Sequence, residues 1–389
     1  MGDESLLVSL SLPDFCLAGA VIGCLYALLA SVLVIRFGRR PRTASAVHEP
    51  VTVLKPLCGV EPGLLARLAP FCRQSYDGPL QIVFGVHDRA DGAVEVVEQL
   101  KAKFPDTAID LKIDGRIHGS NRKVSNLTNM NALARHDVVM LSDGDIEVGP
   151  NYLVDVVASL QNPGVGAVTC LYHGIPRRRG LWPQIAALST NTQFLPNAIM
   201  AMTFGLARPC FGATIALRRE TLNRIGGFAP LSDCLADDYA LGEAVRATGQ
   251  DVTVVPELVG HACVHESASE LLLHQIRAAK TIRSIDPVGY IGSVMTNPLP
   301  FALLGLIAGA TGGVLAVAAA IICRSVLCFT VEKVYRLPRQ PYWLLPLNDV
   351  IEFAVYIASF FGGKVSWRGY RYRVMQDGSL VQDSHLGRS

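Results

Sequence analysis

Residues 137–145 read DVVMLSDGD, a short apolar run that ends in two aspartates separated by one glycine. Such a run is typical of a buried strand. Alternate residues of an extended chain point the same way, so the carboxylates of Asp143 and Asp145 face one point. Hard oxygen ligands at a strand end suit Mg²⁺ or Mn²⁺, the usual partner of a diphosphate. His261 and His265 also follow a predicted strand and could reach the metal, but a lone histidine is more often structural.

The same pattern recurs on both sides of this stretch, from about residue 51 to residue 268. Predicted strands alternate with predicted helices; the strands are 51–54, 81–86 and 137–141, and the helices are 60–72, 93–104 and 126–135. This alternation predicts an α/β domain with a mostly parallel, Rossmann-like sheet, in which ligands bind at the carboxyl ends of the strands. No GxGxxG or GxxxxGK[ST] motif is present, which argues against dinucleotide oxidoreductases and P-loop hydrolases.

Polar side chains stand where the predicted strands end. Lys55 follows the first strand and Asp88 follows the second. Lys123 precedes a helix predicted to start near Asn126, where free backbone amides and the helix dipole would favour a diphosphate. Alone, both lysines are equally compatible with solvated surface charges, and Asp88 with a turn or a helix cap.

An acidic pair and a basic helix face complete the candidate site. Asp237 and Asp238 are adjacent, and neighbouring carboxylates resist ionising together, which raises one pKa toward the range of a general base. A helix N-terminus would produce the same letters. Arg277, Lys280 and Arg283 recur at spacings of three and share one helix face, where they would clamp phosphate or meet anionic lipid headgroups.

The composition indicates a membrane protein, with 50% hydrophobic and 17% charged residues. Residues 15–36 form an apolar segment long enough to span a bilayer. Acidic residues precede it and arginines follow it, which excludes a signal peptide and places residues 1–14 outside the cytoplasm. The domain at residues 50–285 would then be cytoplasmic. A formal net charge of +2 gives no indication of nucleic-acid binding, and the scattered cysteines form no CxxC pair.

A second apolar region covers residues 291–361. Glycines near residue 310 leave two interpretations, a single tilted span or two short spans joined by a turn, and the basic residues that follow favour the second. Asp349 and Glu352 lie in the last apolar segment, so this segment either lies at the interface or turns its charges into the protein. Residues 367–373 are aromatic and basic, and we expect the tail at 362–389 to be cytoplasmic.

Several motifs in order resemble the ceramide glucosyltransferases and the similar bacterial hopanoid-biosynthesis glycosyltransferases, over residues 50–375. They are VLKPL at 53–57, VHD at 86–88, NRKVSNL at 121–127, SDGDI at 142–146, FGAT at 211–214, ADDY at 236–239 and WRG at 367–369. The resemblance implies a nucleotide-diphospho-sugar transferase fold of the GT-A type. It also implies an inverting transfer of glucose or N-acetylglucosamine from a UDP-sugar to a lipid hydroxyl.

The family's functional residues map onto positions of this sequence. The resemblance places the nucleotide at Asp88, the metal and nucleotide-sugar at Asp143 with Asp145, and the catalytic base at Asp238. The last family motif, Gln or Arg, two residues, then Arg-Trp, reads HQIRA at 274–278, so His274 and Arg277 occupy its first and fourth positions and alanine replaces the tryptophan.

The resemblance also suggests where the acceptor lies. Residues 181–206 carry many large apolar groups and would form part of a channel for ceramide or a lipid similar to bacteriohopanetetrol; an ordinary core helix is the alternative. Likeness to the hopanoid branch implies a bacterial inner-membrane protein. A processive polysaccharide synthase and a non-catalytic nucleotide-sugar or lipid-binding relative are the alternatives, and the oligomeric state is not indicated.

Overall fold

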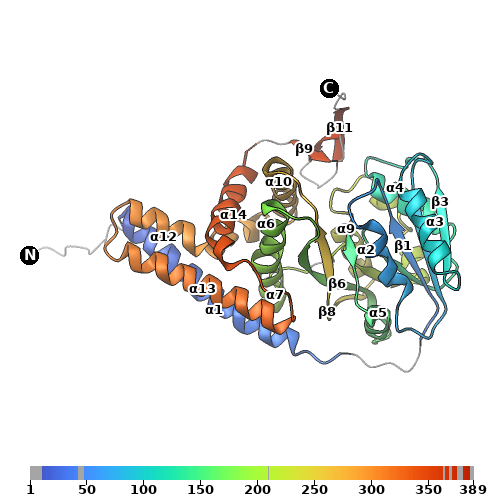
Figure 1. Ribbon diagram of the computed structural model, residues 1–389, viewed down its shortest axis with the longest axis horizontal. Coiled ribbons are helices and arrows are strands. Elements are labelled where there is room, and N and C mark those ends of the chain that lie inside the picture. Colours follow the sequence, from blue (N-terminus) through green and yellow to red (C-terminus); the bar gives the residue numbers. More distant parts are fainter. Residues whose placement is uncertain are drawn as a thin grey trace, which may run out of the picture.

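The computed structural model describes residues 11–42, 48–208, 210–361, 364–367, 370–374 and 380–385. Figure 1 shows three parts along the long axis of the molecule: a helical bundle that includes the N-terminal helix, a middle layer of helices, and a sheet domain covered by helices. Of the predicted extracytoplasmic residues 1–14, positions 1–10 lie outside the described residues.

The sheet domain is built on an eight-stranded mixed sheet in the order β3-β2-β1-β4-β7-β6-β8-β5. Its strands are β1 (Val51–Pro56), β2 (Leu80–Val86), β3 (Ala108–Ile113), β4 (Val138–Leu141), β5 (Ile146–Glu147), β6 (Val165–Pro176), β7 (Ile215–Arg218) and β8 (Asp251–Cys263). The first four strands in this order pair in parallel, as expected. β7 then runs antiparallel to both β4 and β6, and β5 antiparallel to β8, so the sheet is mixed.

The predicted strands are buried on both faces, because their successive side chains pack into two different cores. On β1, Val51 and Val53 face one core, whereas Leu54 faces the other. Helices α2, α3 and α5 cover the first face, and α4, α8 and α9 cover the second. These helices are α2 (Leu64–Leu68), which continues into the 3₁₀ turn η1 (Ala69–Cys72), α3 (Ala93–Lys103), α4 (Arg122–Asn131), α5 (Tyr152–Leu160), α8 (Arg219–Arg224), followed by the 3₁₀ turn η3 (Ala229–Leu231), and α9 (Asp237–Ala247).

The predicted start of the fourth helix needs correction. α4 begins at Arg122 and not near Asn126, because Asn121 caps it: the Asn121 side chain accepts a hydrogen bond from the Val124 amide at 3.1 Å. Lys123 therefore lies inside the first turn of the helix rather than ahead of it.

Two helices are long and apolar enough to cross a membrane, α1 (Leu12–Gly38) and α13 (Gly313–Val334). The second apolar region is not one continuous helix. α12 (Pro298–Ile307) ends in a turn in which Gly309 and Gly312 adopt left-handed backbone angles, and α13 follows it. α11 (Pro287–Gly292) and the 3₁₀ turn η4 (Ser293–Thr296) precede α12 at a bend of 62°. Two short spans joined by a glycine turn remain our prediction for this region.

The middle layer connects the bundle to the sheet (Figure 1). It contains α6 (Leu181–Ser189), a π-helical turn η2 (Thr190–Phe194), α7 (Leu195–Thr203), α10 (Ala268–Ile285), the 3₁₀ turn η5 (Tyr342–Leu344) and α14 (Leu345–Ser359). Asp349 of α14 is 1% exposed and Glu352 is partly buried. Both carboxylates have partners within the protein, so α14 turns its charges inward.

The C-terminal segment forms a separate three-stranded antiparallel sheet in the order β11-β10-β9. Its strands are β9 (Lys364–Trp367), β10 (Tyr370–Val374) and β11 (Leu380–His385). The predicted aromatic and basic segment at 367–373 falls on β9 and β10, and positions 368 and 369 lie outside the described residues.

Candidate active site

The turn after β4 carries Asp143 and Asp145, and the buried Lys55 side chain donates hydrogen bonds to it. The Lys55 ammonium donates to the Asp143 carbonyl at 2.7 Å and to Ser142 Oγ at 3.2 Å, and it lies 3.9 Å from the centre of the Phe71 ring. Burial lowers the pKa of Lys55 to about 7. The Lys55 side chain is fully buried, and its predicted role in nucleotide-sugar binding remains a prediction. Its contacts fix the shape of the turn.

Lys123 links Asp143, the first aspartate of the predicted metal-binding pair, to the acidic pair Asp237 and Asp238. Its Nζ lies 2.8 Å from Asp143 Oδ1 and 3.1 Å from Asp237 Oδ2. Burial alone would lower the pKa of Lys123, but the carboxylates of Asp143, Asp237 and Asp238 raise it well above its usual range. Asn121, which caps the same helix, donates from Nδ2 to Asp237 Oδ1 at 3.3 Å. One ammonium therefore holds carboxylates from two distant segments.

Asp238 lies in the first turn of α9, where two backbone amides hold its carboxylate. Gly212 N–H donates to Oδ2 at 2.9 Å and Tyr239 N–H donates to Oδ1 at 2.8 Å. Burial, followed by the charge of Asp237, raises the pKa of Asp238 to about 6. A carboxylate with such a pKa is suited to accept a proton near neutral pH.

Gly212 leaves the space in which these groups meet. A Cβ atom at this position would lie 3.0 Å from Asp143 Oδ2, 3.1 Å from Lys123 Nζ and 3.4 Å from Asp238 Oδ2. Asp143, Lys123 and the candidate base Asp238 thus surround one glycine.

Asp145 contacts His261, one of the two histidines noted after a predicted strand. His261 of β8 lies 3.4 Å from Asp145 through Nε2 and Oδ2. Burial would lower the pKa of His261, but the charge of Asp145 raises it well above its usual range. The strand pairing Ile146↔His261 places the two residues side by side.

The altered motif on α10 approaches the same edge of the site. The rings of His274 and His265 meet edge to face with centroids 5.0 Å apart. Burial, followed by the charge of Arg277, lowers the pKa of His274 to about 3, so this imidazole is neutral at physiological pH. His274 therefore contributes an aromatic contact with His265 here, and Arg277 carries the positive charge.

The donor set fits a divalent cation that also binds a diphosphate. Asp143 and Asp145 offer carboxylate oxygens, the hard ligands that Mg²⁺ and Mn²⁺ prefer. Among the residues that the structure describes, no three His, Cys, Asp or Glu side chains come together as a complete metal cage. The two carboxylates would therefore need phosphate oxygens or water to complete the coordination.

Asp88 is the site residue that the structure leaves apart. It is exposed after β2, and its carboxylate accepts the Ala90 amide at 2.9 Å, as in a turn. Its role at the nucleotide remains a prediction. Asn121 and Gly212 lie within the NRKVSNL and FGAT motifs, but neither was predicted as a functional residue. Asn121 could have been predicted as an N-cap, because asparagine is a preferred residue at the start of a helix.

An aromatic cluster lies between these carboxylates and the membrane bundle. Tyr172 of β6 stacks on Phe194 of η2 with ring centroids 4.3 Å apart, and Phe211 packs edge-on against both rings. Burial, followed by the charges of Asp238, Asp145 and Asp143, raises the pKa of Tyr172, which places it beside the site. Phe194 and Phe211 also pack against the hydrophobic core shared by α1, α7 and α13. Apolar surface therefore extends from the helical bundle to Phe211, the residue directly before Gly212.

Comparison with known proteins agrees with this architecture. The fold is similar to that of a mannosyltransferase from Pyrobaculum calidifontis, solved in complex with GDP-Man and Mn²⁺, with a TM-score of 0.52, 19% identity, and coverage of 90% of this chain and 99% of that one. Ceramide glucosyltransferase 1 of Caenorhabditis elegans is 24% identical over 223 residues, or 57% of this chain and 47% of that protein. Ceramide glucosyltransferase of Candida albicans is 29% identical over 125 residues, or 29% and 23%.

These alignments span less than half the length of the two curated relatives. The family match is broader, because the description "Glycosyl transferase family 21" applies to residues 15–380. It covers the α1 helix, the sheet domain and the C-terminal helices together. The chain therefore belongs to glycosyl transferase family 21.

Proposed function

We propose that the protein is a membrane-bound inverting glycosyltransferase that moves glucose or N-acetylglucosamine from a UDP-sugar to a hydroxyl of a membrane lipid. The acceptor is of the ceramide or hopanoid type. The sheet domain lies on the cytoplasmic side of a bacterial inner membrane. Family membership and the arrangement of Asp238, Lys123 and Asp143 support this proposal.

Asp238 is the general base of the proposed reaction. Its carboxylate takes the proton from the acceptor hydroxyl while that oxygen forms a bond to the anomeric carbon of the sugar. The bond from that carbon to the diphosphate breaks, its electron pair leaves with UDP, and the anomeric configuration inverts. The amides of Gly212 and Tyr239 orient the carboxylate for this step.

The leaving diphosphate needs positive charge at the opposite side of the sugar. Asp143 and Asp145 would hold Mg²⁺ or Mn²⁺, which when bound would neutralise charge on the departing UDP. Lys123, in the first turn of α4, adds an ammonium and the free amides of a helix N-terminus. Arg277 supplies a second cation from α10, and Asp88 would contact the nucleotide.

The observation that carries the lipid acceptor is the aromatic cluster of Tyr172, Phe194 and Phe211. Each ring is partly exposed, and the cluster joins the core of the membrane helices to the surroundings of Asp238. An acceptor with its hydroxyl on an apolar body can keep that body in contact with apolar surface while the hydroxyl reaches the base. A fully polar acceptor would bury less apolar area against this surface than a lipid does. The segment 181–206, which contains Phe194, is the proposed acceptor segment.

Mass spectrometry of the lipid products tests the proposal. Purified protein with Mg²⁺ or Mn²⁺ would receive UDP-glucose or UDP-N-acetylglucosamine, each with ceramide or bacteriohopanetetrol. We expect one glycolipid that disappears with EDTA and with the Asp238→Asn variant. Absence of product from every combination, with UDP release no faster than in the variant, would contradict the proposed function.

A further inference from the structure

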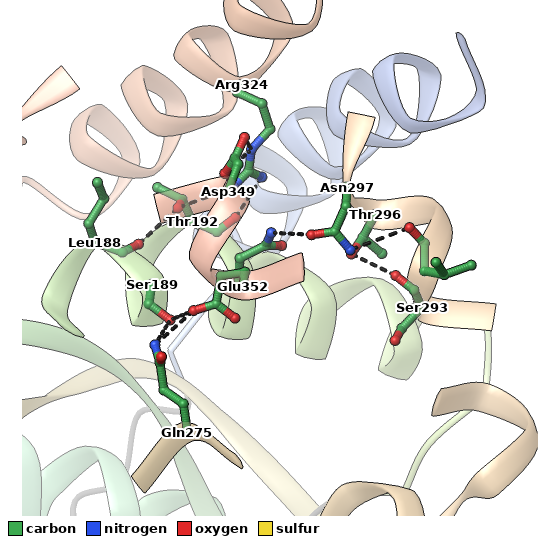
Figure 2. Close-up of polar contacts among 12 residues, drawn as sticks. Leu188, Ser189, Thr192, Gln275, Ser293, Thr296, Asn297, Arg324, Asp349 and Glu352 are labelled. Atoms are coloured by element: carbon green, nitrogen blue, oxygen red, sulfur yellow. Dashed lines mark hydrogen bonds and ion pairs between the residues drawn. The ribbon is translucent and has the colours of Figure 1, made fainter. Parts of the chain in front are cut away.

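Helix α14 carries two carboxylates on one face, and they connect different parts of the molecule (Figure 2). Asp349 and Glu352 are three residues apart, which places them on the same side of the helix. Carboxylates in an otherwise apolar segment are costly and need compensation. The hydrogen-bond and ion-pair partners of Asp349 and Glu352 therefore indicate the structural role of each carboxylate.

Asp349 anchors α14 to the long membrane-spanning helix α13. Arg324 Nε donates to Asp349 Oδ2 at 2.9 Å and Arg324 Nη2 donates to Asp349 Oδ1 at 2.8 Å. Arg324 Nη1 also donates to the Thr192 carbonyl at 2.9 Å, which ties the π-helical turn η2 into the same contact. These groups are buried, so α13, α14 and η2 are held in one arrangement.

Glu352 reaches from the same face to α10. Gln275 Nε2 donates to Glu352 Oε1 at 2.8 Å and lies 3.1 Å from Ser189 Oγ. Ser189, the last residue of α6, donates to the same carboxylate oxygen. The Gln275 carbonyl Oε1 is buried and has no hydrogen-bond partner in the part of the chain that the structure describes. A leucine would avoid that cost, so the amide is retained for its donor group.

The hydrogen bond between Gln275 and Glu352 lies close in sequence to the residues of α10 that approach the candidate active site. Gln275 lies directly after His274 and two residues before Arg277, on the helix that we propose contacts the donor diphosphate. Apolar side chains, among them Ile276, Ala279 and Val355, also contribute to the contact between α10 and α14. Apolar packing tolerates sliding along a helix, whereas a hydrogen bond fixes one register.

We propose that Glu352 is a positioning residue, which through Gln275 sets the place of α10 and its Arg277 relative to the membrane-spanning helix α13. This inference rests on the proposed function for its kinetic consequence. The buried Arg324–Asp349 pair holds α14 against α13, and the hydrogen bond from Gln275 to Glu352 holds α10 against α14.

The test compares Glu352→Leu with a reversed pair. Glu352→Leu removes the acceptor, and we expect the KM for the UDP-sugar to rise about tenfold while kcat changes less than about threefold. Gln275→Glu alone would place two carboxylates together and should act similarly. The double variant Gln275→Glu with Glu352→Gln restores a hydrogen bond in the opposite direction and should recover most of the KM. A loss of kcat at constant KM, or no recovery in the double variant, would overturn the positioning role.

Glu332→Gln serves as the matched control, because Glu332 lies on α13 itself and accepts from Gln340 N–H and Tyr342 O–H, neither of which belongs to α10. We expect its donor KM to be unchanged. Equilibrium titration with UDP-sugar and hydrogen exchange of residues 268–285 separate this inference from the proposed function. If no glycosyl transfer occurs in any variant, faster exchange of α10 in Glu352→Leu, but not in Glu332→Gln, would still support it. Equal exchange in both would refute it.

Discussion

At the scale of single residues, the site depends on one carboxylate held by two amides. Asp238 accepts from Gly212 N–H and Tyr239 N–H, and its pKa is raised to about 6 by burial and by Asp237. An asparagine at this position keeps the shape and can still accept one amide, but it cannot take a proton from the acceptor hydroxyl.

We therefore expect Asp238→Asn to reduce kcat by about 10³-fold, the usual range for loss of a general base. The dissociation constant for the UDP-sugar should change less than about threefold, because the diphosphate contacts are elsewhere. Radiolabelled sugar transfer and equilibrium donor titration measure the two quantities. Turnover close to that of the unaltered protein would exclude Asp238 as the base.

The pH profile gives a second test of the same residue. Since the base acts when deprotonated and its pKa lies near 6, kcat/KM should fall as pH drops below about 6, approaching tenfold per pH unit. An ordinary aspartate would keep its charge to about pH 4. Asp237→Asn removes the neighbouring charge that raises this pKa, so the acidic limb should move to lower pH. An acidic limb that stays in place would contradict the assignment.

At the scale of elements, the sequence predicted what local patterns encode. The strands β1, β2 and β4 were predictable because their apolar runs are buried on both faces. α4 starts four residues before the predicted position, because the Asn121 side chain caps the helix. Strand β7 was not predicted, because its four residues are too few to show a recognisable hydrophobic period.

The contact between α1 and α12 is the element-scale feature most open to test. Gly19 and Gly23 stand four apart on α1, a spacing that lets membrane helices approach closely. A Cβ at Gly23 would lie 2.8 Å from Pro298 Cα, and one at Gly19 would lie 2.7 Å from the Phe301 ring. Because a proline backbone cannot yield, Gly23→Leu should push the helices apart.

We expect Gly23→Leu to lower the free energy of unfolding by about 2 kcal/mol through overpacking. The thermal unfolding midpoint in one detergent measures this effect. Val21→Leu provides the control, because Val21 is 57% exposed on the same helix and should tolerate the extra methylene. Equal midpoints for the two variants would show that α1 and α12 do not need this close approach.

In the whole molecule, the candidate site residues could be predicted from the sequence, but which of them contact one another could not. Asp143, Asp237 and Asp238 were predictable as candidates because acidic residues follow a strand or stand in pairs. Their link through Lys123 was not, because it joins segments that only the folded topology brings together. The same holds for Asp145 and His261, which meet because β5 pairs with β8. Local pattern gives residue type and element, whereas non-local strand order decides the partners.

The buried Arg324–Asp349 pair should be the main electrostatic contribution to the joint between membrane helices and middle layer (Figure 2). Asp349→Asn leaves the guanidinium buried with no opposing carboxylate, so we expect the free energy of unfolding to fall by about 3 kcal/mol. The double variant Arg324→Met with Asp349→Leu removes both charges and should recover much of that loss, because neither charge remains uncompensated. Glu220→Gln breaks an exposed pair with Arg224 and should change stability by less than about 0.5 kcal/mol. Thermal unfolding of the four proteins in one detergent distinguishes these cases, and an Asp349→Asn midpoint equal to that of Glu220→Gln would show that the pair does not hold the joint together.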